Sequence, residues 1–448
     1  MRQMAMVGFL QAQNCTQVAS SWRHPEARLD FLTADYFQHV ARVLEAGKFH
    51  LGFFDDRLAM PEYGPDHGPI VQNGIRCVKM DPTTILMAMG MAAPRIGLGA
   101  TYSTTYYEPF HVARVFATLD LMTGGRAAWN VVTSVNDGEA QNMGKLEHLA
   151  HDLRYDRADE FMDVVLGHWD TWDDGSIVTD RDTGTFAVPE KVRRLGHEGA
   201  FFRSRGPFTV PRSPQGHPVV IQAGSSGRGK RFAARWGELI FVAYGDLATG
   251  RRSYAELKDE VARLGRDPDQ VKIASLISPV VAETRAEAED KMTVIQQGYR
   301  DIDGLSLLSE ALNFDFATKS LDEAFTAEEL AGMTGMHAMR DHVMEACGRA
   351  NPTVRDFLRI TQRGKPAHPV IGSPAEVADT LEEWFTAHAC DGFVVSATHI
   401  PGSYEDFVRL VIPELQRRGL HQRDYAGRTL RDNLGLRRPE VGALRGVR

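Results

Sequence analysis

The chain has 448 residues, of which 43% are hydrophobic and 25% are charged, a composition typical of folded globular proteins. Its 51 basic and 59 acidic residues give a net charge of -8, which argues against nucleic acid as a partner, because neutralising phosphates requires an excess of lysine and arginine. The four cysteines are scattered and form no CxxC pair. With no signal peptide and no run of about 18 apolar residues, the sequence predicts a cytoplasmic protein without a membrane span.

Short apolar runs alternate with longer helical patterns, which is typical of βα units and a parallel sheet. In the first half we expect strands at residues 4–10, 52–56, 96–104 and 126–134, and helices at 31–45, 82–92, 111–121 and 154–169. Further strands are expected at 218–223, 238–243, 271–281 and 391–398, with helices from about residue 229 and at 249–264. Eight strand–helix units predict an α/β fold, a TIM (β/α)8 barrel in which residues 1–448 form one domain with insertions.

Two segments depart from this alternation. Residues 283–372, between the seventh strand and the last helix before the eighth, are an insertion that is mostly helical by pattern. Its centre, residues 304–335, is apolar but weakly periodic, so we expect a mobile lid over the site, with an oligomer contact as the alternative. The C-terminal arm, residues 416–448, mixes arginines with leucines, which predicts a contact with another subunit of a homodimer or homotetramer.

A turn rich in glycine and serine follows the fifth predicted strand and begins a helix. Its sequence is AGSSGRGKR at residues 223–231, and the hydroxyls of Ser225 and Ser226 with the helix N-terminus could hold a phosphate. It nearly matches a Walker A loop, but Arg231 stands where that loop has the Ser or Thr that holds magnesium. A turn needed only for tight packing is the alternative.

Other candidate binding residues are polar side chains at strand ends and one histidine–tyrosine pair. Asp56, Thr101 and Asn130 each lie at the carboxyl end of a predicted strand, where a TIM barrel builds its site, although strand ends are also polar because loops begin there. His151 and Tyr155 are four residues apart on one helix face, where they would either donate to a phosphate or cap the helix. The histidines in this segment lack the HExxH or HxxEH order of a zinc site, so we expect no metal.

Several longer motifs resemble one known family, and they are spread over nearly the whole chain. They are SSWR at 20–23, ATYSTTYYEPFHVARVFATLD at 100–120, WNVVTS at 129–134, HDLRY at 151–155, RGP at 205–207 with VPRSPQG at 210–216, QAGSS at 222–226, PELQRRG at 413–419 and TLRDNLGL at 429–436. These segments resemble the nitrilotriacetate monooxygenase component A family of bacterial luciferase-like proteins. The family is similar to dibenzothiophene sulfone, EDTA and long-chain alkane monooxygenases.

The resemblance implies a luciferase-like TIM barrel that is the oxygenase of a two-component system. It would bind reduced FMN (FMNH2) delivered by a separate NAD(P)H:flavin reductase, react with dioxygen to form a peroxyflavin, and oxygenate a small organic substrate. By the same resemblance, the residues that line the flavin are Asp56, Thr101 and Asn130, and those that hold its phosphate end are His151, Tyr155, Ser225 and Ser226. No catalytic residue is implied, because the peroxyflavin requires a dry, closed pocket and no obligatory general base.

Two other classes of protein would keep the same barrel. A non-catalytic flavin-binding barrel would lack oxygenation, and a deazaflavin-dependent oxidoreductase of the same superfamily would use a different cofactor. The family motifs favour FMN. Asp55 places a second carboxylate before Asp56, where relatives often carry a small residue, so a relative's substrate does not transfer to this chain.

Overall fold

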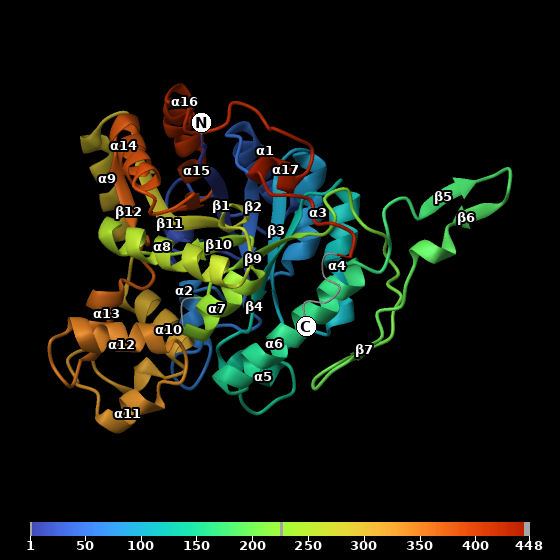
Figure 1. Cartoon of the computed structure of the whole chain (residues 1–448). Coiled ribbons are helices and arrows are strands. Elements are labelled where there is room, and N and C mark those ends of the chain that lie inside the picture. Colours follow the sequence, from blue (N-terminus) through green and yellow to red (C-terminus); the bar gives the residue numbers. More distant parts are fainter. Residues whose placement is uncertain (1, 225–226, 443–448) are drawn as a thin grey trace.

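The computed structural model describes residues 2–224 and 227–442. Within these residues eight parallel strands close into a barrel, because the first and last strands of the series, β10 and β11, also pair with each other (Figure 1). The barrel strands are β1 (Ala5–Gln11), β2 (Leu51–Asp55), β3 (Gly97–Ser103), β4 (Ala127–Val132), β9 (Val219–Gln222), β10 (Leu239–Val242), β11 (Lys272–Val281) and β13 (Gly392–Ser396). The predicted TIM barrel is confirmed. Six of these strands lie inside their predicted ranges, and β1 and β2 are shifted by one residue.

Helices surround the barrel, as their single apolar faces require. The main ones are α1 (Ala34–Ala46), α3 (Pro82–Ala92), α4 (Pro109–Met122), α6 (His151–Trp169), α7 (Gly227–Trp236), α8 (Leu247–Arg263), α14 (Pro374–Thr386), α15 (Gly402–Asp406) and α16 (Ile412–Arg417). Helix α3 has its predicted bounds, whereas α1 begins three residues late because the side chain of Thr33 accepts a hydrogen bond from the Tyr36 N–H. None of the described helices has the length and apolar character needed to cross a bilayer.

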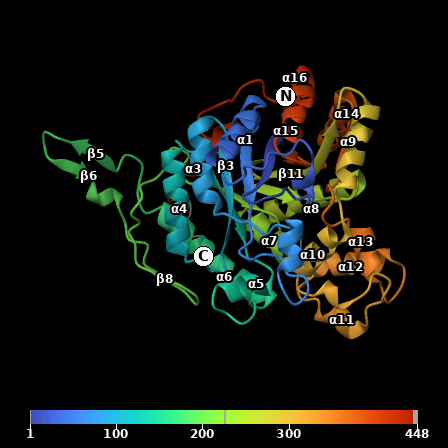
Figure 2. The same cartoon turned by 180° about the vertical axis from the view of Figure 1, so that it is seen from behind.

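Smaller elements lie in the segments that connect the barrel strands and helices. Helices α2 (Gly68–Asn73) and α5 (Asp137–Asn142) follow strands β2 and β4 in the chain. Two hairpins, β5 (Ile177–Asp180) with β6 (Thr185–Ala187) and β7 (His197–Glu198) with β8 (Arg203–Ser204), follow α6. The β5–β6 hairpin projects away from the barrel in both views (Figures 1 and 2).

The insertion forms a second packed unit on one side of the barrel (Figure 2). This unit consists of α10 (Asp301–Leu312), α11 (Ala327–Gly332), α12 (His337–Ala346) and α13 (Val354–Thr361). The two ends of the insertion, α9 (Arg285–Gln297) and β12 (Pro369–Gly372), pack against β11 instead. Residues 303–312 of α10 are all buried, and they pack beside the rings of Phe316, Phe325 and Phe357. The weak periodicity of this centre did not indicate a firmly packed helix, because buried Ser306, Ser309 and Glu310 interrupt the apolar spacing that would have revealed α10. The role of a lid stays a prediction.

The C-terminal arm packs against its own barrel. Helix α17 (Leu430–Leu434) lies at the end of the barrel opposite the insertion (Figure 1). Leu430, Leu434 and Leu436 are buried against interior side chains of the strands, including Val7 and Leu51. Reading these leucines as a subunit contact was wrong, because they close the amino-terminal end of the same barrel. A homodimer or homotetramer stays a prediction without this support.

One buried ion pair fastens this arm. Arg431 is 1% exposed and donates to both carboxylate oxygens of Glu238, at 2.6 and 2.8 Å. Burial by itself would raise the pKa of Glu238, but the charge and hydrogen bonds of Arg431 outweigh it and lower the pKa to about 2. The pair therefore stabilises the fold only while Glu238 is ionised.

We expect Arg431→Met to lower the free energy of unfolding by about 3–5 kcal/mol, because Glu238 would stay buried without its cation. Urea unfolding measures this, and the double variant Arg431→Met/Glu238→Gln should recover most of the loss. A group whose pKa is lowered by folding stabilises the fold at pH values above its unfolded pKa. The difference in free energy of unfolding between Arg431→Met and wild type should therefore be complete above pH 4.5 and should vanish as the pH falls toward 2. A single variant as stable as wild type would contradict the role of the pair.

Candidate functional site

The carboxyl ends of β2, β3 and β4 bring two predicted site residues into contact. Thr101 and Asn130 are register partners on neighbouring strands, and the Asn130 amide donates to the Thr101 hydroxyl at 2.9 Å. The Thr101 hydroxyl in turn donates to the Phe54 carbonyl at 2.9 Å. The Oδ1 atom of Asn130 is buried and has no hydrogen-bond partner among the described residues. A ligand with an N–H donor would satisfy this acceptor.

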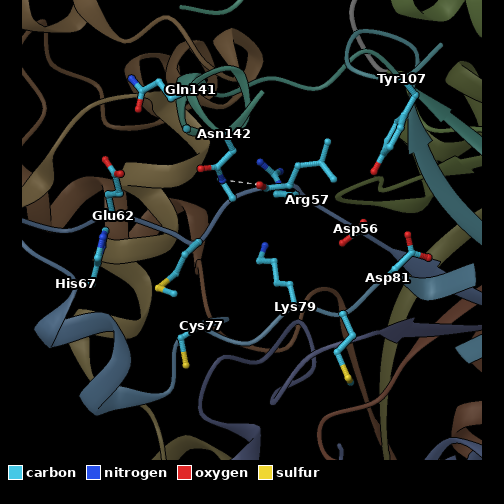
Figure 3. A pocket seen from close by; sticks show the side chains of 15 residues that line it. Asp56, Arg57, Glu62, His67, Cys77, Lys79, Asp81, Tyr107, Gln141 and Asn142 are labelled. Carbon is cyan, nitrogen blue, oxygen red and sulfur yellow. Dashed lines mark hydrogen bonds between the residues drawn. The ribbon is translucent and has the colours of Figure 1, made fainter. Parts of the chain in front are cut away.

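Asp56 follows β2 directly and lines a cavity of about 570 Å³. Burial raises the pKa of its carboxyl to about 7, a rise to which Asp55 adds and which Lys79 opposes. In Figure 3, Arg57 and Lys79 lie near the middle of this cavity, with Tyr107 on the same side as Asp56. The side chain of Asp56 therefore changes charge near neutral pH inside a pocket. Thr101 and Asn130 do not line this cavity.

Among the predicted phosphate-binding residues, Tyr155 has a described side chain, and it lies beside the start of α7. Tyr155 on α6 is 7% exposed, and its ring packs edge-on against Phe232 of α7 at 5.6 Å. The guanidinium of Arg228, in the first turn of α7, lies 5.6 Å from the centre of the Tyr155 ring. Tyr155 thus stands beside the turn that joins β9 to α7. Ser225 and Ser226 fall outside the described residues, and so does the side chain of His151, which begins α6.

The glycines of this turn have a packing reason as well. A Cβ atom at Gly224 would lie 2.9 Å from the Cα atom of Gly229, closer than real Cβ atoms approach their neighbours. The backbone N–H of Gly224 donates to the Gln222 side chain at 2.5 Å. Tight packing and an anion site are therefore compatible uses of the same turn.

A charged cluster beside Asp56 was not predicted. Glu310 of α10 is buried and lies 3.5 Å from Arg76, 3.6 Å from Lys79 and 4.0 Å from Arg57, measured between nitrogen and carboxylate oxygen. Burial would raise the pKa of Glu310, but these cations together with Arg363 lower it to about 2. The cluster joins the insertion to the loops after β2. The sequence signal was Arg57 next to Asp55 and Asp56, and nothing local indicated Glu310.

One group of possible metal ligands occurs among the described residues. His24, Glu26 and His399 offer ligand atoms within 4.8 Å of one another. The two imidazole rings, however, are stacked 3.6 Å apart at an angle of 9°. Nitrogen lone pairs of parallel rings do not converge on one ion, so this arrangement is a stacked histidine pair. The absence of a metal stays a prediction.

Known proteins resemble this chain over nearly its whole length. A family model described as luciferase-like monooxygenase matches residues 10–391. The dibenzothiophene-sulfone monooxygenase of Rhodococcus erythropolis is 42% identical over 450 aligned residues, which cover 98% of each chain. The nitrilotriacetate monooxygenase component A of Aminobacter aminovorans is 38% identical, with 94% of each chain covered.

A solved structure agrees with these relatives. Riboflavin lyase, solved with modified FMN and its substrate riboflavin, matches at a TM-score of 0.86 and 30% identity, over 97% of this chain and 96% of that chain. The resemblance seen in the motifs is thereby confirmed. The protein is a monooxygenase, and its chain belongs to the luciferase-like monooxygenase family.

Proposed function

We propose that this monooxygenase takes reduced FMN from a separate NAD(P)H:flavin reductase and transfers one oxygen atom of dioxygen to a small organic substrate. Membership of the luciferase-like family carries the proposal. One relative is named as component A of its monooxygenase, which implies a second component for that protein. A solved neighbour contains modified FMN. The first observation supports a separate partner component, and the second supports a flavin cofactor.

The residues at the barrel mouth fit a flavin. The unsatisfied Oδ1 of Asn130 would accept a hydrogen bond from a ring N–H, and Tyr155 beside the start of α7 would donate to the phosphate. Bound reduced flavin would supply the electrons that activate dioxygen. The chain's own part is to orient the ring through Thr101 and Asn130 and to keep water out with the packed insertion. The deazaflavin alternative has less support, because relatives at 38–42% identity are named monooxygenases.

The first test separates these cofactors. We expect anaerobic titration to show tighter binding of reduced FMN than of oxidised FMN, and no oxidation of NADH or NADPH by the isolated protein, because no GxGxxG begins a helix after any strand. With an added reductase, dibenzothiophene sulfone and nitrilotriacetate are suitable probes for incorporation of ¹⁸O from ¹⁸O₂. Direct oxidation of NADH, or a preference for reduced deazaflavin, would refute the proposal.

A second test concerns the phosphate end of the flavin. Tyr155→Phe keeps the ring packed against Phe232 and removes only the hydroxyl, so we expect reduced FMN to bind more weakly by about 1–3 kcal/mol. Fluorescence titration under anaerobic conditions measures this. Tyr254→Phe, which removes a hydroxyl that donates to Asp391 at 2.9 Å, is the matched control and should leave the affinity unchanged. Equal affinity of Tyr155→Phe and wild type would place the phosphate elsewhere.

A third test uses the titration of Asp56. Because burial raises its pKa to about 7, Asp56 gains a negative charge as the pH rises from 6 to 8. That charge would repel the anionic reduced flavin, so we expect its affinity to fall over this range. Asp56→Asn should keep only the pH dependence that comes from the FMN phosphate itself, and the exposed control Asp322→Asn should keep the wild-type profile. An equal pH dependence in Asp56→Asn and wild type would exclude this carboxyl as its cause.

A further inference from the structure

A second cavity lies between the barrel and the insertion, with a volume of about 660 Å³. Its walls come from the loop after β10, from β11, from residues 360–370 of the insertion and from α14. Apolar and aromatic side chains make up much of this wall, among them Tyr244, Leu276, Leu307, Trp384 and Phe393. The cavity therefore suits an organic molecule with an apolar body.

The charged side chains of this cavity are all cationic. Arg76, Arg363 and Lys365 line it, and none of the described residues in its lining is Asp or Glu. Arg76 is only 5% exposed, and its backbone has φ of 49°, a conformation that side-chain-bearing residues adopt rarely. The Nε–H groups of Arg76 and Arg363 are buried and find no acceptor among the described residues. Buried donors of this kind call for an acceptor.

The carboxylates nearest to these cations do not line the second cavity. Four cationic side chains, those of Arg57, Arg76, Lys79 and Arg363, act on Glu310. The carboxyls of Asp55 and Asp56 lie in the same region, and Asp56 is only part-ionised at neutral pH because burial raises its pKa to about 7. None of these three carboxylates lines the second cavity, whereas Arg76 and Arg363 do. Burial and the repulsion of Arg76 and Arg57 lower the pKa of Arg363 to about 10, as expected where cations crowd together.

Arg76 also connects this cavity to the candidate site. It borders a small gap that is lined by Asp55, Asp56, Arg57 and Lys79 as well. Three of these residues, Asp56, Arg57 and Lys79, also line the first cavity. An anion held by Arg76 would thus lie close to Asp56, which the resemblance places along the flavin.

We propose that the second cavity binds the oxygenase's substrate, and that this substrate is an organic anion. A carboxylate or sulfonate would accept hydrogen bonds from Arg76 and Arg363, and an apolar body would lie against Tyr244, Leu276 and Trp384. The assignment as substrate rests on the proposed function, whereas the anion site itself does not.

The test is calorimetric titration of the flavin-free, full-length protein at low ionic strength. The probes are hexanoate and hexanesulfonate, with the uncharged hexanamide as the control for shape. We expect both anions to bind at least about tenfold more tightly than the amide, because charge-assisted hydrogen bonds are the stronger ones. Equal binding of hexanoate and hexanamide, or no binding of either anion, would overturn the proposal.

Variants with opposite expected signs sharpen the test. Arg363→Met should weaken hexanoate binding about tenfold, whereas Glu310→Gln should tighten it, because it removes the carboxylate that competes for the same cations. Arg355→Met is the matched control: it lies on α13, pairs with Asp322 at the surface, and should bind hexanoate as wild type does. If Arg363→Met fails to fold, Lys365→Met replaces it, with a several-fold loss expected.

The same variants separate this proposal from the flavin proposal. Reduced FMN affinity is measured in each by anaerobic titration. We expect Arg363→Met to lose hexanoate binding and to keep its affinity for reduced FMN. Loss of FMN affinity with unchanged hexanoate binding would show that the cluster belongs to the flavin site and would overturn the anion site. Because calorimetry needs neither flavin nor reductase, a failed reconstitution of oxygenase activity leaves this result standing.

Discussion

The buried carboxylate of Glu310 joins the insertion to the loops after β2, and on the same helix the buried carboxylate of Asp303 pairs with Arg23. A carboxylate without water is tolerated only when cations surround it, and here the cations come from the loops after β2 and from the end of the insertion. The contact links α10 to cations that line the two cavities, Arg57 and Lys79 in the first and Arg76 in the second. The close packing of α10 is consistent with this cluster, because a loosely packed helix would let water reach the carboxylate of Glu310.

The barrel could be predicted from the sequence because its signals are local. Each buried strand is a short apolar run between turn signals, and helices such as α3 begin at a recognisable cap followed by proline. The polar residues at strand ends could be predicted for the same reason, since the barrel gathers all carboxyl ends at one mouth. Thr101 and Asn130 are indeed hydrogen-bonded there. Their role toward a flavin stays a proposal.

What could not be predicted depends on contacts between distant parts of the chain. Nothing in the local sequence shows that Leu430 enters the bottom of the barrel or that Arg431 finds Glu238. The same holds for Glu310, whose ion-pair partners Arg57, Arg76 and Lys79 stand more than two hundred residues earlier in the chain. Helix α10 could not be recognised from its sequence either. A helix that is buried on all sides has no polar face, so its hydrophobic residues do not recur with the helical period.

Strand β11 has a consequence for how this fold can change. Its first part pairs with β10 and β13 inside the barrel, and its last four residues, Ser278 to Val281, pair with β12, where the insertion ends. The insertion thus leaves and returns along one strand, so its two stems are fixed side by side whatever lies between them. The length and sequence of the insertion can therefore change during evolution without disturbing closure of the barrel, provided that a carboxylate is kept opposite Arg57, Arg76 and Lys79. New substrate ranges could thus evolve on an unchanged oxygenase frame.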